Sequence, residues 1–469
     1  MLKGTALFFA WICVSLIQGN DEFIQTSENI AAARDTAAWK QRTVYQVLTD
    51  RFAGGSRSDL GSYCGGTFNG LKNNLKYIKD MGFDAIWISP VTDNIDNGYH
   101  GYWFKNFEKI NSHFGTADDL KNLVATAHQM DIWVMVDVVA NHVGPVGTNY
   151  AQIYPFNSSS HYHSSCDITD WKNQNMVENC RLSSLPDLNQ DVSFVRSYLK
   201  NWVKQLVQTY GFDGIRIDTV PEVHPDFWAE YGSSAGVFQV GEVFNGDPAY
   251  VGPYQKYLTS VFNYPMYFTI ADVFGSGMDM SNLQNRYNAE GSYFKDIDAL
   301  GSFVDNHDNA RFLNKFPEKK AQLRAANVFV LTGRGIPFVY YGTEQYFNGD
   351  ADPNNREVLW TKMDTSSDFY KLFKVVNAQR KKSKIWNQPW VERYSNPNFY
   401  SFSRGEFLVA LTNSNDQQHF KVTYHPFKDG QVICNIFYPT SDCQTVNGGV
   451  QVYLLNGESK IYVPKDMLA

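Results

Sequence analysis

The sequence predicts an α/β fold in which eight parallel strands close into a barrel, and three observations support that prediction. Eight short apolar runs, rich in β-branched and aromatic residues, recur along the 469 residues, as buried parallel strands do. Stretches with the apolar period of amphipathic helices separate them, such as 118–130 and 192–210. Polar or charged residues cluster where several runs end, and strand ends form the active-site face of a (β/α)8 TIM barrel. The runs are 44–52, 83–89, 132–139, 212–220, 237–244, 259–264, 301–308 and 337–345.

Two further segments interrupt and follow the predicted barrel. The gap between the third and fourth runs, 143–190, is long and rich in Ser, Asn and Tyr, which is typical of a functional insertion or a small subdomain. From residue 384 to 469 the pattern changes to short alternating strands with turns, which predicts an antiparallel β-sandwich. The barrel itself would then comprise residues 20–142 and 191–383.

The N-terminus resembles a secretion signal. Lys3 precedes an apolar run of thirteen residues at 5–17, which is too short to span a bilayer and suits a signal peptide. Cleavage near Gly19 would remove residues 1–19; the alternative is a buried N-terminal helix. No later segment is long and apolar enough to cross a membrane, so we expect a secreted protein.

Composition excludes several classes of protein. Hydrophobic residues make up 43% of the chain and charged residues 19%, which excludes a disordered or fibrous protein. Aromatic residues reach 15%; these belong to a core or to surfaces that stack on sugar rings. The net charge of −7 and the absence of a basic run argue against nucleic acid or an anionic membrane as the main partner.

Five cysteines follow the predicted signal peptide, an odd number. Four form two pairs that are close in sequence in turn-rich stretches, and we expect both to be bridged in an oxidising compartment. Cys64 would remain a free thiol. Asn157, in Asn-Ser-Ser, is a glycosylation sequon. The expected disulfides are Cys166–Cys180 and Cys434–Cys443.

Three carboxylates follow three of the predicted strands. Arg216 and Asp218 point to the same side of a strand, and the cation keeps its neighbour ionised, as a nucleophile requires. Glu242 ends the next strand in an apolar stretch, which raises the pKa of a proton donor. Asp308 follows His307 at a third strand end. Each feature alone has a structural alternative, namely a strand-capping ion pair, a buried carboxylate, or a brace or metal-ligand pair. Together they fit glycoside hydrolysis.

Five stretches carry a resemblance to a known family: 137–142, 184–188, 214–218, 241–243 and 303–308. In these stretches, and in their order, the sequence resembles the α-amylase family of glycoside hydrolases and is similar to the secreted fungal members. The resemblance implies a calcium-dependent enzyme that hydrolyses internal α-1,4-glucosidic bonds in starch, glycogen and maltooligosaccharides with retention of configuration. Asp218 would be the nucleophile and Glu242 the general acid/base, while Asp308 would hold sugar hydroxyls and help to distort the ring.

The resemblance also implies residues that bind the sugar chain. His142 and His307 would hydrogen-bond the sugar in the −1 subsite, and Tyr102 would stack beneath it. An aromatic cluster is otherwise usually core, and an Asp–Arg pair four residues apart can simply be a surface ion pair. The remaining implied contacts are His100 and Trp103 beside Tyr102, Arg216 beside the nucleophile, Asp352 and Arg356 on the outer glycone side, and Glu222 on the aglycone side.

Ca²⁺ is the implied metal, a hard cation that prefers oxygen ligands. Asn141, Glu178 and Asp187 match the family's ligands, together with the backbone carbonyl at Glu222. Such an ion would tie the insertion to the barrel. The alternative for Glu178 is an exposed acid beside a disulfide.

The sequence departs from the family pattern after the nucleophile. Fungal members commonly have Lys-His where this chain has Pro221-Glu222, which removes one cation and reverses the charge on the aglycone side. Residues 51–63 also contain no cysteine to pair with Cys64, so one disulfide that is common in the family is absent.

The catalytic trio leaves related activities open. Exo-acting, maltose-forming and transglycosylating relatives use the same three carboxylates, so cleft shape decides among them. A non-catalytic carbohydrate-binding protein on the same fold is the alternative from another class. We expect a monomer whose partners are α-1,4-glucans, with neither nucleic acid nor a membrane as partner.

Overall fold

The structure is a computed structural model that describes residues 34–469; the predicted signal peptide, 1–19, lies outside the described residues. Eight parallel strands form its centre in the order β8-β7-β6-β5-β2-β1-β10-β9, and a parallel bridge between Phe262 and Gly301 joins the two outer strands. The predicted fold class is therefore confirmed. The strands are β1 (Val44–Gln46), β2 (Ala85–Ile88), β5 (Trp133–Val138), β6 (Gly214–Ile217), β7 (Phe238–Gly241), β8 (Ser260–Val261), β9 (Gly301–Ser302) and β10 (Ile336–Tyr340).

The observed strands are shorter than the apolar runs that predicted them. The run 44–52 contains β1 and then α3 (Thr49–Phe52), a helical turn with four buried side chains. The run 337–345 likewise ends in a 3-10 turn, Thr343–Gln345. The prediction of strands was wrong for the second halves of these two runs. Their residues are apolar because the loops above the barrel are buried.

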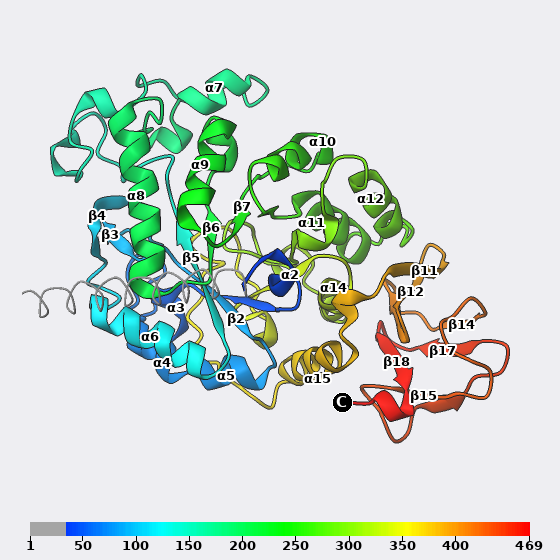
Figure 1. The fold of residues 1–469 in the computed structure, drawn as a ribbon. Helices are drawn as coiled ribbons and strands as arrows, with labels where there is room; N and C mark the ends of the chain where they lie inside the picture. Colours follow the sequence, from blue (N-terminus) through cyan, green and yellow to red (C-terminus); the bar gives the residue numbers. More distant parts are fainter. Residues whose placement is uncertain (1–33) are drawn as a thin grey trace, which may run out of the picture.

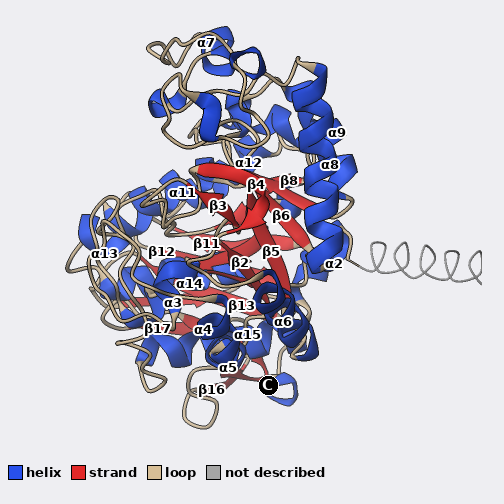
Figure 2. Ribbon diagram, turned by 90° about the vertical axis from the view of Figure 1, so that its left-hand side faces the viewer, coloured by secondary structure: helices blue, strands red, loops and turns tan. Residues whose placement is uncertain are grey.

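Helices surround the strands (Figure 2). The two predicted helices are confirmed as α6 (Ala117–Gln129) and α8 (Ser193–Tyr210). α6 begins at a capping box in which Thr116 and Asp119 satisfy each other's backbone N–H groups. The other helices of the barrel are α2 (Thr36–Trp39), α4 (Phe68–Asn73), α5 (Leu75–Asp80), α9 (Pro225–Ala235), α10 (Pro248–Val251), α11 (Tyr264–Ile270), α12 (Asn282–Glu290), α13 (Phe312–Lys315), α14 (Lys320–Thr332) and α15 (Asp368–Ser383).

The insertion between β5 and β6 stands beyond the C-terminal ends of the strands (Figure 1). It holds one short α-helix, α7 (Gln174–Asn179), and the Cys166–Cys180 disulfide. A bridge from His142 to Asp187 joins it to the chain that leaves β5. A hairpin that the sequence did not predict, β3 (Thr92–Asn94) and β4 (Phe104–Ile110), lies beside it and pairs through Asn106 with Tyr154.

The C-terminal region forms two antiparallel sheets that share a small apolar core (Figure 1). Cys434 and Cys443 are bonded across two neighbouring strands of the larger sheet. In the part of the chain that the structure describes, no helix is long and apolar enough to cross a membrane. The larger sheet comprises β11 (Trp390–Ser395), β12 (Phe399–Arg404), β13 (Phe407–Thr412), β18 (Lys460–Pro464), β15 (Val432–Asn435) and β16 (Cys443–Thr445), and the smaller β14 (Gln418–Val422) and β17 (Val450–Leu454).

Candidate functional site

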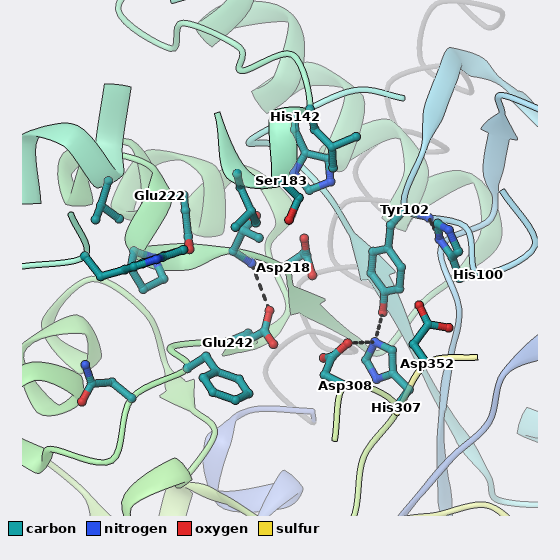
Figure 3. Close-up of a pocket in the computed structure, with 18 of the residues that line it drawn as sticks. His100, Tyr102, His142, Ser183, Asp218, Glu222, Glu242, His307, Asp308 and Asp352 are labelled. Carbon is teal, nitrogen blue, oxygen red and sulfur yellow. Dashed lines mark hydrogen bonds and ion pairs between the residues drawn. The ribbon is translucent and has the colours of Figure 1, made fainter. Parts of the chain in front are cut away.

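A cleft of about 680 Å³ lies at the C-terminal ends of the barrel strands, beside the insertion (Figure 3). This volume is typical of a ligand site. Arg216 is buried beneath it. The structure brings together at this cleft all three predicted catalytic residues and most predicted sugar contacts: His100, Tyr102, Trp103, His142, Asp218, Glu222, Glu242, His307, Asp308, Asp352 and Arg356.

One guanidinium group contacts both central carboxylates. Arg216 lies on β6 and places Nη1 2.6 Å from an Asp218 oxygen and Nη2 2.9 Å from a Glu242 oxygen. Asp137 on β5 contacts the same Nη1 at 3.2 Å. Because β5, β6 and β7 are neighbours in register, three separate strands position this cluster. The two carboxyl groups therefore stand side by side at the base of the cleft.

The surroundings of Glu242 favour its protonated form. Its side chain is buried, and it accepts hydrogen bonds at 3.3 Å from the Thr219 backbone N–H and the Tyr264 hydroxyl. Burial raises the pKa of Glu242 well above its usual value; Arg216 opposes this rise, and the negative charges of nearby Asp308 and Asp218 add to it. A carboxyl group with a raised pKa can donate a proton near neutral pH.

Asp308 also lines the cleft, in a more exposed setting than Asp218. One of its oxygens is 3.5 Å from His307 Nε2 and 3.7 Å from Arg356 Nη2. Arg356 also pairs with Asp352 at 3.1 Å. The predicted Asp352–Arg356 pair is thus an ion pair that lines the cleft.

Tyr102 is held by its hydroxyl group and its neighbours. The hydroxyl donates to Asp137 Oδ2 at 2.7 Å and lies 2.7 Å from His307 Nε2, and the His307 and Tyr102 rings stack at 5.4 Å (Figure 3). His100 accepts from the Tyr102 backbone N–H and packs edge-on against Trp103. The sequence analysis gave Asp137 no role, although it begins one of the stretches that carry the resemblance.

His142 has a free nitrogen at the cleft. Its ring is buried, and Nε2 has no partner among the described residues. Burial lowers the pKa of His142, so the ring is neutral near pH 7. A polar ligand that enters the cleft can supply the missing hydrogen bond.

Three oxygen atoms converge where the insertion meets the barrel. The side-chain amide oxygen of Asn141 faces the Glu222 backbone carbonyl oxygen at 3.1 Å and an Asp187 carboxylate oxygen at 3.0 Å, with no donor between them. The other Asp187 oxygen contacts His163 Nδ1 at 2.8 Å. Rotating the amide would let its nitrogen donate to both oxygens; otherwise a cation must hold them together. Oxygens about 3 Å apart suit the ligand shell of Ca²⁺.

Glu178, the remaining predicted calcium ligand, has a hydrogen-bond partner of its own. It lies on α7, and its carboxylate accepts a hydrogen bond from Gln174 Nε2 at 2.9 Å. The same amide nitrogen donates to the Pro221 carbonyl oxygen at 2.9 Å. The Gln174 side chain thus links Glu178 to the chain just before Glu222, and the role of Glu178 as a calcium ligand stays a prediction.

The cleft is also lined by two aromatic residues that were not predicted from the sequence. Trp171 of the insertion and Phe244, two residues after Glu242, line the cleft with 58% and 51% of their surfaces exposed. Both were visible in the sequence only as aromatic residues among many. Glu222 also lies here; its Oε2 is buried without a partner among the described residues, and burial raises its pKa to about 8, with contributions from the charges of Asp218 and Asp187.

The remaining predicted features lie away from the cleft. Both expected disulfides are present. Cys64 is a free, fully buried cysteine, and burial raises the pKa of its thiol. Asn157 is exposed on the insertion.

Comparisons with known proteins agree on one family. The family model for the α-amylase catalytic domain matches residues 46–407. The chain is 38% identical to an α-amylase of Saccharomycopsis fibuligera, over 92% of this chain and 93% of the relative. It is 37% identical to α-amylase 2 of Schwanniomyces occidentalis, over 100% of this chain and 98% of the relative. The solved structure of an α-amylase from Malbranchea cinnamomea superposes with a TM-score of 0.89 at 34% identity, covering 93% of this chain and 98% of that one.

Proposed function

Because the chain belongs to the α-amylase family of glycoside hydrolases, we propose that it is an endo-acting α-amylase that cleaves internal α-1,4-glucosidic bonds. Its substrates would be starch, glycogen and maltooligosaccharides. The observation that carries the proposal is the shared contact of Asp218 and Glu242 with Arg216, at 2.6 and 2.9 Å. Retaining glycosidases need their two carboxyl groups about 5–5.5 Å apart, and two carboxylates on one guanidinium group are close enough.

The two carboxyl groups would divide the chemistry. Arg216 stabilises the ionised form of Asp218, which attacks the anomeric carbon and forms a covalent glycosyl-enzyme. Glu242 gives its proton to the departing oxygen as the glycosidic bond breaks. It then takes a proton from water, whose oxygen attacks the anomeric carbon and releases Asp218. The product keeps the α configuration, because the anomeric carbon is inverted twice.

The remaining cleft residues would bind and distort the sugar. Asp308 has an exposed oxygen available for sugar hydroxyls, and His142 has its unpartnered Nε2. Tyr102 presents a ring on which the −1 sugar can stack. His307 would hydrogen-bond the same sugar, and Arg356 would act further along the glycone side. The sites that complete this list are His100 and Trp103 beside Tyr102, Asp352 beside Arg356, and Glu222 on the aglycone side.

Calcium would be held by Asn141, Asp187 and the Glu222 carbonyl oxygen. The donor-free cluster of three oxygens supports this assignment. The ion would join the insertion to the chain that follows the nucleophile, and Glu178 on α7 would complete the ligand set that the family resemblance implies.

Secretion and the domain boundaries belong to the same proposal. Two disulfides support an oxidising compartment, and residues 1–19 would be the signal peptide that directs export. Residues 20–142 and 191–383 would form the catalytic barrel, 143–190 the calcium-binding domain and 384–469 the C-terminal sandwich. Asn157, exposed on the insertion, would be available for glycosylation.

The test uses a maltoheptaoside blocked at its non-reducing end. Internal cleavage into several oligosaccharides, with the α-anomer formed first by NMR, would support the proposal. Degradation of unblocked maltoheptaose alone would indicate an exo-acting or transglycosylating relative instead. No reaction on either substrate with calcium present would favour a non-catalytic carbohydrate-binding protein. The Asp218→Asn variant is the matched control, because it should abolish any cleavage that belongs to this site.

A further inference from the structure

Gln46 contacts a residue of the cleft from below. It is the last residue of β1 and is buried, with 3% of its surface exposed. Its side-chain amide nitrogen lies 2.8 Å from His307 Nδ1. In the described part of the chain, it is the one side chain within hydrogen-bond distance of that nitrogen. Neither the motifs nor the mechanism above gives Gln46 a role.

The direction of this contact follows from a count of protons that begins at Asp137. The Asp137 carboxylate accepts a hydrogen bond from Trp87 Nε1 at 3.0 Å. Arg216 Nη1 donates to both of its oxygens, at 3.2 Å from each. Both oxygens therefore face donors and act as acceptors. Burial raises the pKa of Asp137 to about 7, with Arg216 opposing the rise and the charge of Asp218 adding to it, so its role as an acceptor rests on the donors that face both oxygens.

The next two steps lead to the imidazole ring. Tyr102 has one hydroxyl proton, and its oxygen lies 2.7 Å from Asp137 Oδ2 and 2.7 Å from His307 Nε2. Since Asp137 can only accept, the tyrosine proton is donated to it. The Tyr102 oxygen must then accept from His307, which requires a proton on Nε2.

A neutral imidazole carries one proton, so Nδ1 is then an acceptor. Burial, with Arg356 and Arg216 nearby, lowers the pKa of His307 well below its usual value, which keeps the ring neutral. The amide N–H of Gln46 is the donor that Nδ1 needs. All donors and acceptors match in the series Gln46 to His307 to Tyr102 to Asp137.

We propose that Gln46 is a positioning residue that fixes the tautomer of His307, so that Nε2–H donates to the Tyr102 hydroxyl oxygen at the edge of the cleft. The other tautomer would place a lone pair 3.5 Å from the Asp308 carboxylate. In that tautomer Asp137 and His307 Nε2 would both be acceptors, and the single Tyr102 hydroxyl proton could be donated to only one of them. The fixed tautomer holds the Tyr102 ring, on which the −1 sugar is proposed to stack, so the effect on catalysis rests on the proposed function, whereas the tautomer itself does not.

The first experiment reads the tautomer directly. The full-length enzyme is labelled with ¹⁵N-histidine, and NMR shows which ring nitrogen carries the proton; the His307→Asn variant identifies the signals. We expect Nε2–H in the wild type. Gln46→Glu offers only acceptors, so it should place a proton on Nδ1. Gln46→Met offers no hydrogen bond and should give a mixture. A wild-type Nδ1–H signal, or an unchanged tautomer in Gln46→Glu, would overturn the inference.

The second experiment measures steady-state kinetics on the blocked maltoheptaoside. We expect kcat to fall about 10-fold to 100-fold in Gln46→Glu, with a smaller change in KM and a smaller loss of kcat in Gln46→Met. Gln239→Met is the matched control, because Gln239 is a buried glutamine of β7 whose amide donates to Gly232 and Val237 carbonyl groups. Equal losses in all three variants would indicate a structural role only. If neither the wild type nor any variant cleaves the substrate but the tautomer responds to Gln46→Glu, the proposed function fails and the inference stands.

Discussion

The base and one side of the cleft are constructed in opposite ways. The catalytic floor, which we define as Arg216, Asp218 and Glu242, is buried, and each carboxylate is paired with the guanidinium group. The open wall, which we define as Trp171, Glu222 and Phe244, combines two half-exposed aromatic rings with a carboxylate oxygen that is buried without a partner among the described residues.

This difference separates chemistry from specificity. Bond cleavage requires groups held in one geometry, and the floor achieves this with side chains from adjacent strands. Trp171 and Phe244 lie on loops with half of their surfaces exposed, where substitutions alter the fit of a sugar without displacing the carboxylates. The replacement of the family's Lys-His by Pro221-Glu222 falls on the open wall.

The largest effect on activity should come from a substitution in the catalytic floor. Glu242→Gln removes the transferable proton and should lower kcat/KM on maltoheptaose by about 10³-fold or more. Glu290→Gln provides the control, since Glu290 is another fully buried acid that hydrogen-bonds Asn263 rather than lining the cleft. Comparable losses in both variants would mean that removing any buried acid damages the barrel.

The pH dependence of kcat/KM should show how Asp308 changes the pKa of Glu242. Glu242 must be protonated to act as an acid, so its pKa sets the alkaline limb of kcat/KM. The negative charge of Asp308 raises the pKa of Glu242. Asp308→Asn should therefore move the alkaline limb of the residual activity to lower pH. Asp352→Asn removes a charge on the same side of the cleft and should leave that limb in place; a limb unmoved in Asp308→Asn would contradict the assignment.

Metal removal should affect the junction beside the open wall. A cation at 100 times its Kd contributes about 3 kcal/mol of stability, which corresponds to a shift of a few degrees in Tm for a chain of this size. A chelator should lower the Tm of the wild type by that amount and should not affect Asp187→Asn. Asp170→Asn changes an exposed acid of the same insertion and should respond like the wild type. Equal responses of all three proteins would place the ion elsewhere.

The smallest effect on turnover should come from the open wall itself. Glu222→His restores the residue common in fungal relatives and should change the ratio of oligosaccharide products several-fold. Turnover should change less, because the hydrogen bonds of the floor remain. Glu222→Gln keeps the shape of the protonated carboxyl group, so it separates the effect of the imidazole ring from the effect of removing the acid. An unchanged product profile in both variants would remove Glu222 from the aglycone side.

The sequence predicted the floor better than the wall for a physical reason. Parallel strands place their carboxyl ends at one face, so Asp218, Glu242 and Asp308 could be assigned to a common site from strand positions alone. The exposure of Trp171 and Phe244 depends on loop paths that leave no periodic signal.

Contacts beneath the cleft were equally hidden from the sequence. The approach of Gln46 to His307 joins residues 261 positions apart. The β3–β4 hairpin was missed because β4 is only partly buried and forms no long apolar run. The stretch 49–52 was misassigned because a buried helical turn reads like a strand.

The closure of the barrel has a mechanical consequence. β8 and β9 have two residues each, and a single bridge between Phe262 and Gly301 joins them. A closed sheet resists widening only as strongly as its weakest strand pair. Heating or pulling would therefore separate β8 from β9 first. Glu242 follows β7, on one side of this seam, and Asp308 follows β9, on the other. Opening the seam would draw these carboxylates apart, and activity would be lost on heating before the rest of the chain unfolds.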